Sequence, residues 1–305
     1  MTETESPAPA AASAAATAIR VGVVGLGDIG RGVAGTFADA GLVLTVCDVR
    51  AEATEALAAR ASVAGSPAEL AGRSDTVFVA VVNDEQVREV VGGPDGILAG
   101  AGPGCSVVIL STITTSTLVE LAPGCASRGV ALVDCGVSGG PGAAASGQLV
   151  CMVGGAAGAV EAVRPALEVM GSLILHMGPL GAGLRAKLAR NVVQYGSWLA
   201  AYEAQCLAEA AGIDLQLLGQ AIKASDALIG GASTLMFRTT VAPWPAETHA
   251  GLLQAMRNGA ALAHKDLAAA MALADGLGVP MPLAGLTEAT CDRIFGLGAE
   301  AKESM

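Results

Sequence analysis

The sequence predicts an α/β domain with a doubly wound, largely parallel sheet, followed by an all-α domain. Two patterns support this prediction. From residue 19 to about residue 180, short apolar runs alternate with helix-like stretches, as is typical of buried parallel strands connected by helices. After Gly183 the strand pattern ends, and the long segments that follow are rich in alanine and leucine. We therefore expect a first domain over residues 19–182 and a second, helical domain over residues 183–305.

The expected elements follow from these patterns in chain order. Strands are predicted at Arg20–Val24, Val43–Asp48, Thr76–Val82, Val107–Leu110, Val130–Asp134, Leu149–Val153 and Leu173–Met177. Helices are predicted between several of them, at Glu52–Ala61, Asp84–Val91 and Thr117–Ser127. In the second domain, glycine and proline are expected to interrupt the helices at Gly212, Gly230-Gly231, Pro243-Trp244-Pro245, residues 276–280 and Pro282.

Composition limits the partners of the chain. The formal net charge is −11, which argues against nucleic acid because phosphate backbones bind clustered lysine and arginine. Two uncharged runs, residues 96–119 and 135–160, are broken by Gly, Pro, Ser and Thr, so they indicate strands, loops and helices rather than membrane spans. Residues 1–18 lack a basic start and a leucine-rich core, and they indicate a disordered tail rather than a signal peptide.

The cysteines and histidines indicate a reducing compartment and no metal site. The seven cysteines form no CxxC pair, and Cys47, Cys135 and Cys151 lie in apolar strand-like runs, where reduced core thiols are expected. We therefore expect a cytoplasmic protein. The three histidines have neither the HxH nor the HxxxH spacing of a metal site.

A glycine-rich turn follows the first predicted strand. Gly25-Leu26-Gly27-Asp28-Ile29-Gly30 has the GxGxxG spacing of a dinucleotide-binding loop, at the junction of a strand and a helix. The glycines permit a tight turn, let the backbone approach a pyrophosphate and allow the helix to pack closely on the strand. The start of the helix adds N–H groups and the positive end of the helix dipole. The motif therefore predicts a dinucleotide site, against the alternative of a turn that binds nothing.

An acidic residue at the end of the second strand favours NAD. Asp48 lies where a carboxylate accepts hydrogen bonds from the adenosine ribose, and its charge would repel the 2′-phosphate of NADP. Arg50, two residues later, would offset part of this repulsion. A turn or capping role for Asp48 is the alternative, and its position alone leaves that open. We expect NAD as the cofactor, with NADP the less favoured one.

A second glycine cluster spans Asp134 to Ala143 and follows a later strand. The segment is expected to be too glycine-rich to pack into a core, so we interpret it as a loop. Backbone N–H groups of such a loop, together with the Ser138 hydroxyl, suit a carboxylate. A flexible turn without function is the alternative. Because ligands of open α/β sheets lie beyond the carboxyl ends of strands, the position favours a substrate site.

The next segment contains a lysine in an apolar setting. Gly183, Lys187 and Asn191 are spaced four residues apart and share one face of a helix. A lone lysine on a helix is usually a solvated charge. Near a nicotinamide, however, a lysine can exchange a proton with an alcohol while a hydride leaves the neighbouring carbon. This interpretation predicts an oxidoreductase.

Four motifs, in order, resemble those of the β-hydroxyacid dehydrogenases, the family of 3-hydroxyisobutyrate dehydrogenase, tartronate semialdehyde reductase and 6-phosphogluconate dehydrogenase. Residues 25–30 resemble the family's GLGxMG, with Ile29 in place of methionine. Residues 134–143 resemble its DVSGGxxGA loop, residues 183–191 its GxxxKxxxN helix, and residues 262–267 its KDL motif. The resemblance spans nearly everything after the tail. It implies a Rossmann-like domain joined by a long helix to an all-helical domain, with the site in the cleft between them.

The resemblance also implies roles for individual residues. Lys187 would be the general acid/base, and Asn191 would orient it and the substrate. Substrate contacts would come from Ser138, Gly139, Gly140 and Asp266. Cofactor contacts would come from Gly25, Leu26, Gly27, Asp28, Ile29, Gly30, Asp48, Val82, Asn83, Thr112 and Lys265. Val82-Asn83 stands where relatives often have Leu-Pro, which leaves the local backbone open.

These observations predict an NAD-dependent oxidoreductase that converts a small, carboxylate-bearing 3-hydroxy acid to its semialdehyde, or the reverse. One alternative is an NADP-dependent imine reductase, against which Lys187 and Asp48 both argue. Another is a non-catalytic cofactor-binding interaction protein, which would be expected to lack the lysine and to carry basic segments. Arg190 stands where the sugar-phosphate branch of the family tends to carry histidine, and the sequence does not decide whether it faces the site.

The helical domain is expected to form the contacts between subunits. The segment 184–211 is apolar over more than one face, which is more than a single core normally needs. The family resemblance implies a homodimer or homotetramer. Phe237, Arg238 and Trp244 are expected either in the core of this domain or in the pocket that selects the substrate.

Overall fold

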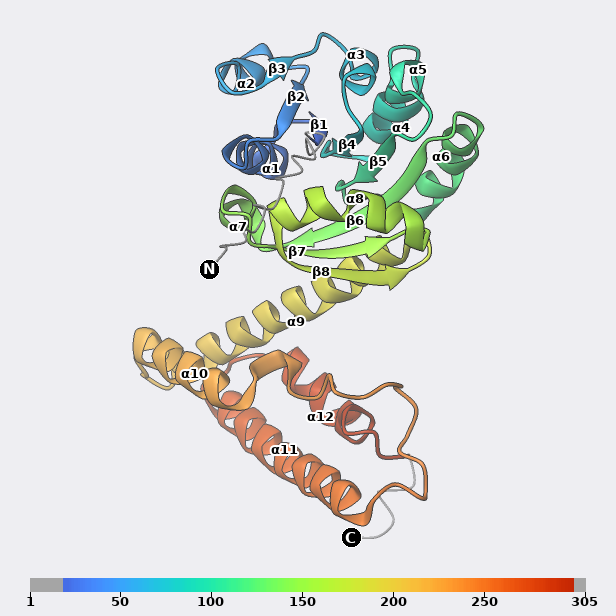
Figure 1. Cartoon of the computed structure of the whole chain (residues 1–305). Helices are drawn as coiled ribbons and strands as arrows, with labels where there is room; N and C mark the ends of the chain where they lie inside the picture. The colour runs from blue at the N-terminus through green and yellow to red at the C-terminus, as the bar shows by residue number, and fades with distance from the viewer. Residues whose placement is uncertain (1–18, 299–305) are drawn as a thin grey trace, which may run out of the picture. The chain divides into compact units, whose positions relative to one another are not determined.

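The computed structural model describes residues 19–298 (Figure 1). The predicted disordered tail, residues 1–18, lies outside the described residues. The chain folds into two compact units, one that ends at Ala189 and one that begins at Arg190. The division falls inside helix α9 (Ala182–Ala210), the long helix expected between the two parts of the chain. We call the first part the sheet unit and the second the helical unit.

The sheet unit contains one sheet of eight strands in the order β3-β2-β1-β4-β5-β6-β7-β8. Neighbouring strands pair in parallel, except that β6 and β7 are antiparallel. The strands are β1 (Arg20–Val24), β2 (Val43–Cys47), β3 (Ser62–Val63), β4 (Thr76–Val79), β5 (Ser106–Ile109), β6 (Ala131–Ser138), β7 (Leu149–Gly154) and β8 (Gly171–Gly178). The strand order reverses between β1 and β4, where doubly wound sheets bind ligands. The structure confirms the predicted doubly wound, largely parallel sheet.

Helices cover both faces of the sheet (Figure 1). One apolar cluster, which includes Phe37 and Val163, packs α1 (Asp28–Asp39) and α8 (Ala157–Met170) against one face. A second cluster covers the other face. Its helices are α3 (Pro67–Gly72), α4 (Asp84–Gly92), α5 (Ile97–Gly100) and α6 (Thr115–Ser127). The short helices α2 (Ala51–Glu55) and α7 (Gly140–Ala145) complete the unit, and α2 is shorter than the predicted Glu52–Ala61.

Apart from shifts of one or two residues at strand ends, the sheet differs from the prediction in three places. The two-residue strand β3 is too short to give a sequence pattern. β4 ends at Val79 rather than Val82, because the following residues turn into α4. β6 continues to Ser138, and the residues that the sequence assigns to a loop, Cys135 to Ser138, are buried in the sheet. The expectation that residues 134–143 are too glycine-rich to pack into a core is therefore wrong for their first half.

The helical unit contains the rest of α9 and three further long helices. These are α10 (Leu215–Ile229), α11 (Ala250–Leu277) and α12 (Pro282–Ile294), with the 3₁₀ turn η1 (Gly231–Ser233) after α10. Pro282 is the first residue of α12, where its missing N–H is tolerated. The buried Glu203 of α9 accepts the N–H groups of Leu283 at 2.8 Å and Ala284 at 3.1 Å. This carboxylate therefore joins α9 to the start of α12.

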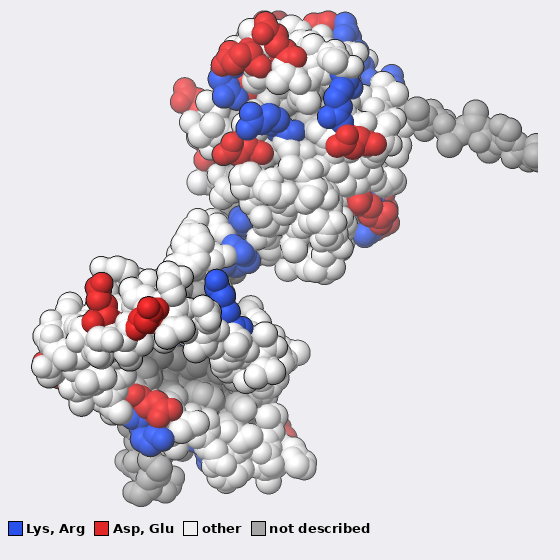
Figure 2. Space-filling view, turned by 90° about the vertical axis from the view of Figure 1, so that its left-hand side faces the viewer, with Lys and Arg blue, Asp and Glu red and all other residues white. Residues whose placement is uncertain are grey.

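The described residues contain neither a helix that could span a membrane nor a cluster of side chains that could hold a metal ion. Among residues 19–298, no helix is both long and apolar enough to cross a membrane. The same residues contain no group of three His, Cys, Asp or Glu side chains that could hold a metal ion. On the visible face of the sheet unit, acidic and basic side chains are mixed (Figure 2). Because the formal net charge is −11, positive potential for the predicted carboxylate substrate has to come from individual side chains and N–H groups.

Candidate functional site

The GxGxxG motif forms the turn between β1 and α1. Gly27 directly precedes α1, and within residues 19–298 no side chain caps this helix. The first N–H groups of α1 are therefore available to an anion at the positive end of the helix dipole. Leu26 is buried and Ile29 packs against the core, whereas Asp28 is exposed. The turn thus offers mainly backbone groups to a ligand.

The three glycines of this motif have different surroundings. Gly25 has a φ of +88°, and a Cβ there would lie 2.6 Å from the carbonyl oxygen of Ala80. A Cβ on Gly30 would overlap the carbonyl oxygen of Gly25, so the start of α1 needs this glycine to pack on the turn. No described atom lies within 4 Å of a Cβ placed on Gly27. This open space suits a pyrophosphate that approaches the backbone closely.

Asp48 is hydrogen-bonded to the glycine turn. Its carboxylate accepts the N–H of Leu26 at 2.6 Å and the N–H of Arg50 at 2.9 Å, and Arg50 Nε lies 3.1 Å from Oδ1. Burial would raise the pKa of Asp48, but the hydrogen bonds from the Arg50 side chain and the two N–H groups outweigh it and lower the pKa. Asp48 is therefore ionised at neutral pH. Its hydrogen bonds to backbone N–H groups also give it a structural role at the glycine turn, independent of any ligand.

The turn after β4 contains Val82 and Asn83. The Val82 side chain is exposed, and its N–H donates to Gln86 Oε1 at 2.9 Å. Asn83 Oδ1 accepts the N–H of Gln86 at 2.9 Å and so caps α4. The two bonds resemble a capping box, except that Gln86 accepts the N–H of the residue before the N-cap, and they constrain the local backbone where relatives often have Leu-Pro.

The turn after β4 is tied to the loop after β5 by Asp84. Its Oδ1 accepts the N–H of Thr114 at 3.0 Å and the hydroxyl of Thr117 at 2.5 Å. Thr112, the predicted nicotinamide contact, is exposed in the same loop. The sequence prediction does not include Asp84, because it is one of two acidic residues in the first turn of α4 and resembles an ordinary helix-dipole charge.

The predicted carboxylate site is a short turn at the end of β6. Ser138 is the last residue of the strand and is largely buried. Gly139 and Gly140 have φ values of +129° and +73°, a backbone region that favours glycine. The chain then enters α7. The three residues predicted to bind the carboxylate therefore lie where β6 ends and α7 begins, whereas residues 134–137 belong to the strand itself.

Lys187 lies on α9 within the sheet unit and is partly buried. A Cβ placed on Gly136 would lie 2.5 Å from Lys187 Cβ, so the lysine stem passes directly over β6 at this glycine. Gly136 and Ser138 point to the same face of the sheet because they are two residues apart on one strand. Asn191 follows Lys187 by one helical turn, and Arg190 is exposed.

Lys265 and Asp266 lie on α11 of the helical unit. Lys265 Nζ is 3.2 Å from Asp266 Oδ1, and both side chains are exposed. The preceding His264 lies between two carboxylates of α12, with Nδ1 2.9 Å from Glu288 and Nε2 3.4 Å from Asp292. The hydrogen bond with Glu288 raises the pKa of His264. Sequence patterns do not reveal this contact, since its partners are 24 and 28 residues away.

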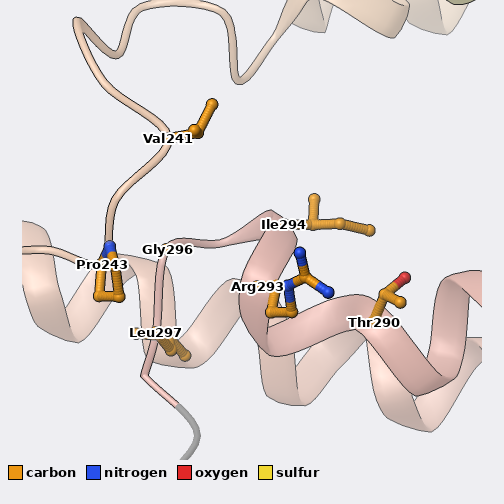
Figure 3. A pocket seen from close by; sticks show the side chains of 7 residues that line it. All are labelled: Val241, Pro243, Thr290, Arg293, Ile294, Gly296 and Leu297. Carbon is orange, nitrogen blue, oxygen red and sulfur yellow. The ribbon is translucent and has the colours of Figure 1, made fainter.

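A cavity of about 490 Å³ lies in the helical unit at the end of α12 (Figure 3). It is lined by Val241, Pro243, Thr290, Arg293, Ile294, Gly296 and Leu297. None of the predicted site residues lines it. Beside it, Trp244 stacks with Phe237 at 6.2 Å and lies under Arg238 at 4.8 Å, and its Nε1 donates to the carbonyl of Phe295 at 2.8 Å. Of the two expectations for Phe237, Arg238 and Trp244, core or substrate pocket, these contacts favour packing within the helical unit.

Comparison with known proteins identifies both parts of the chain. Residues 20–178 match the NAD binding domain of 6-phosphogluconate dehydrogenase. Residues 181–303 match the NAD-binding domain of NADP-dependent 3-hydroxyisobutyrate dehydrogenase. The two matches meet at the start of α9, so they follow each other along one chain with the lysine helix in the second.

Individual proteins match over most of their length. An uncharacterized oxidoreductase of Mycobacterium tuberculosis is 40% identical over 268 residues, which are 88% of this chain and 90% of that protein. The NAD-dependent L-serine dehydrogenase of Pseudomonas aeruginosa is 34% identical over 227 residues, which are 74% of each protein. The crystal structure of an oxidoreductase from Mycobacterium avium is similar with a TM-score of 0.85 at 38% identity, covering 92% of this chain and 99% of that one. The chain therefore belongs to the β-hydroxyacid dehydrogenases, NAD(P)-dependent oxidoreductases that act on the CH–OH group of hydroxy acids.

Proposed function

We propose that the protein oxidises a small 3-hydroxy acid to its semialdehyde with NAD, or catalyses the reverse reduction, with Lys187 as the general acid/base. The observation that carries this proposal is the position of Lys187 over Gly136, two residues before Ser138 on the same face of β6. A group that can exchange a proton thus packs against the strand whose end suits a carboxylate. A cytoplasmic location stays a prediction from the cysteine pattern.

The proposed roles follow from the chemistry of each group. A bound nicotinamide would supply the hydride acceptor. In the oxidation, the neutral amine of Lys187 accepts the hydroxyl proton of the substrate, and in the reduction its ammonium form returns that proton to the carbonyl oxygen. The Ser138 hydroxyl and the N–H groups of Gly139 and Gly140 bind the substrate carboxylate. Asn191, one turn after Lys187, orients the amine and the substrate.

The surroundings of Asp48 support NAD rather than NADP. A 2′-phosphate at the end of β2 would meet an ionised carboxylate whose side chain is only 6% exposed. Arg50, which would attract that phosphate, is already paired with Asp48 at 3.1 Å. The remaining cofactor assignments, Val82, Asn83, Thr112 and Lys265, and the assignment of Asp266 to the substrate stay predictions.

The proposal is tested by measuring reduced-cofactor formation with NAD and with NADP. The substrates are 3-hydroxyisobutyrate, glycerate, 3-hydroxypropionate, serine and 6-phosphogluconate. We expect turnover of at least one small hydroxy acid, with a higher kcat/KM for NAD. The Asp48→Asn variant is expected to lower the preference for NAD about tenfold, since removing a like-charge repulsion of roughly 1.4 kcal/mol changes a ratio by that factor.

The control for this variant is Asp39→Asn, which removes one acidic charge at the far end of α1 and should leave the cofactor preference unchanged. A wild-type protein that prefers NADP would contradict the cofactor assignment. If cofactor binds but no hydroxy acid is turned over, imine reduction or a non-catalytic role would replace the proposed reaction.

The helical unit supports a homodimer or homotetramer as part of the proposal. The buried residues of its described part are Glu203, Ala208, Ala260, Ala274, Ala284, Cys291, Gly296 and Leu297, and only Glu203 and Leu297 have side chains larger than that of cysteine. Along α9, Val192, Trp198 and Tyr202 are each at least 60% exposed. The free energy gained by burying so little apolar surface is smaller than the conformational entropy lost when a unit of this length becomes ordered. We infer that a second copy of the chain covers the apolar surface of α9.

Replacement of an exposed aromatic residue tests this association. The Trp198→Glu variant is expected to sediment as a smaller species than the wild type and to unfold at a temperature several degrees lower, because a charge in an apolar interface is costly. Val119→Glu is the matched control, since Val119 is an exposed apolar residue of α6 in the sheet unit. A wild-type protein that sediments as a monomer at micromolar concentration would contradict the assignment.

A further inference from the structure

The start of α9 is held by a buried carboxylate of the sheet. Asp134 is fully buried in β6. Its Oδ1 accepts the N–H of Gly181 at 2.5 Å, and its Oδ2 accepts the N–H of Leu184 at 2.7 Å. N–H groups at a helix start have no partner within the helix. Asp134 therefore caps α9 from a strand that is far away in sequence, and it fixes the helix along its axis.

Two glycines set how deeply α9 lies on the sheet. A Cβ on Gly183 of α9 would overlap the carbonyl oxygen of Met152 in β7. A Cβ on Gly154 of β7 would overlap the Asp134 carboxylate and lie 2.7 Å from the N atom of Gly183. The backbone of the helix thus rests directly on the backbone of the strands. Any larger side chain at either position would lift the helix away from Asp134.

Asp134, Gly136 and Ser138 form one row along β6. Alternate residues of a strand point to the same face, so these three share a face, whereas Cys135 and Val137 belong to the apolar cluster on the other face. Successive members of the row are about 7 Å apart. Asp134 caps the start of α9, and Gly136 lies under the stem of Lys187. Ser138 is the residue predicted to bind the substrate carboxylate.

A carboxylate in this row is costly to bury. Burial raises the pKa of Asp134, and the N–H groups of Gly181 and Leu184 oppose this shift. An apolar residue would fill the same volume without the desolvation cost. Unlike an apolar residue, the carboxylate forms two hydrogen bonds to the start of α9, and these fix both the position of the helix along its axis and its rotation about that axis.

We propose that Asp134 and Gly136 are positioning residues for Lys187. The Asp134 carboxylate sets the place and rotation of the first turn of α9, and the absent side chain at Gly136 leaves room for the lysine stem beside Ser138. This inference rests on the proposed function, in which Lys187 carries the proton. It adds that the position of the amine is set by β6, through two residues that bind neither substrate nor cofactor.

Gly136→Ala tests the steric half of the proposal. The new methyl group would push against the Lys187 stem, and misplacement of a catalytic group by about 1 Å lowers rates on the order of 100-fold. We expect kcat to fall at least tenfold while the Kd for NAD changes less than twofold. In a Lys187→Ala background, the same glycine replacement should cause no further loss. An equal loss in both backgrounds would overturn the proposal. Gly158→Ala in α8, where a Cβ meets no described atom within 4 Å, is the control.

A spectroscopic measurement follows Lys187 without relying on activity. The chain has only the lysines Lys187, Lys223, Lys265 and Lys302, so ¹³C-dimethylation gives few signals, and Lys187→Ala identifies the relevant one. We expect the titration of this signal to change in Gly136→Ala and in Asp134→Asn, which keeps the volume of Asp134 but replaces one acceptor with a donor. An unchanged titration in both variants would overturn the positioning role. Wild-type turnover by Lys187→Ala would instead refute the proposed function, and the titration still decides the positioning.

Discussion

Replacement of Lys187 with alanine is expected to lower kcat by about 10²–10⁴-fold, the range typical of losing a general acid/base. Because the residue lies on α9 over β6 and outside the glycine turn, the Kd for NAD should change little. Lys187→Arg is expected to be nearly as inactive, since a guanidinium does not deprotonate near neutral pH. Steady-state kinetics with the best substrate, together with cofactor titration by fluorescence, measures both quantities.

Lys223→Ala is the matched control, because Lys223 is an exposed lysine on α10 with no assigned role. Its kcat should equal that of the wild type. If Lys187→Ala retains near-normal turnover while it binds cofactor, Lys187 is not the proton-transfer group. Addition of a small primary amine to Lys187→Ala offers a further measurement, since partial recovery of kcat would indicate that the missing function is proton transfer rather than packing.

Sequence patterns predict those parts of the fold whose stability is local. β1 is found at Arg20–Val24 as predicted, because a short β-branched run before a glycine turn is nearly sufficient to define a buried strand. β6 is harder to predict. A charged residue and a glycine within Asp134–Ser138 disfavour a buried strand, and the groups that satisfy the carboxylate lie 47 and 50 residues later. No local window of sequence contains that information.

The candidate site likewise has a part that local sequence predicts and a part that depends on long-range contacts. The GxGxxG turn is one continuous segment, so its spacing predicts both its position and its chemistry. The hydrogen bond between Thr114 and Asp84 joins residues 30 positions apart. The contact between Lys187 and Gly136 joins helix α9 to strand β6. Such contacts depend on how strands and helices pack. The sequence can therefore predict which residue types serve the chemistry, but not which neighbours hold them in place.

The glycines of α1 and its preceding turn differ in their surroundings: some face open space and others are closely packed. Gly27→Ala is expected to raise the Kd for NAD at least tenfold, because its Cβ would enter the open space that suits the pyrophosphate. The φ of −68° at this position is accessible to alanine. The melting temperature should therefore fall by only a few degrees, as expected for loss of a glycine N-cap. Cofactor titration and thermal unfolding of the same preparation measure both effects.

Two neighbouring variants make this result interpretable. Gly35→Ala also adds a methyl group in open space, but in the middle of α1, where alanine stabilises a helix by up to about 1 kcal/mol; it should leave the Kd for NAD unchanged. Gly30→Ala places its methyl group on the carbonyl oxygen of Gly25, so it is expected to destabilise the whole sheet unit. An unchanged Kd in Gly27→Ala would mean that the dinucleotide does not approach this turn. A raised Kd in a folded Gly27→Ala variant would show that Gly27 is needed for cofactor binding, whereas loss of folding in Gly30→Ala would show that Gly30 is needed for packing.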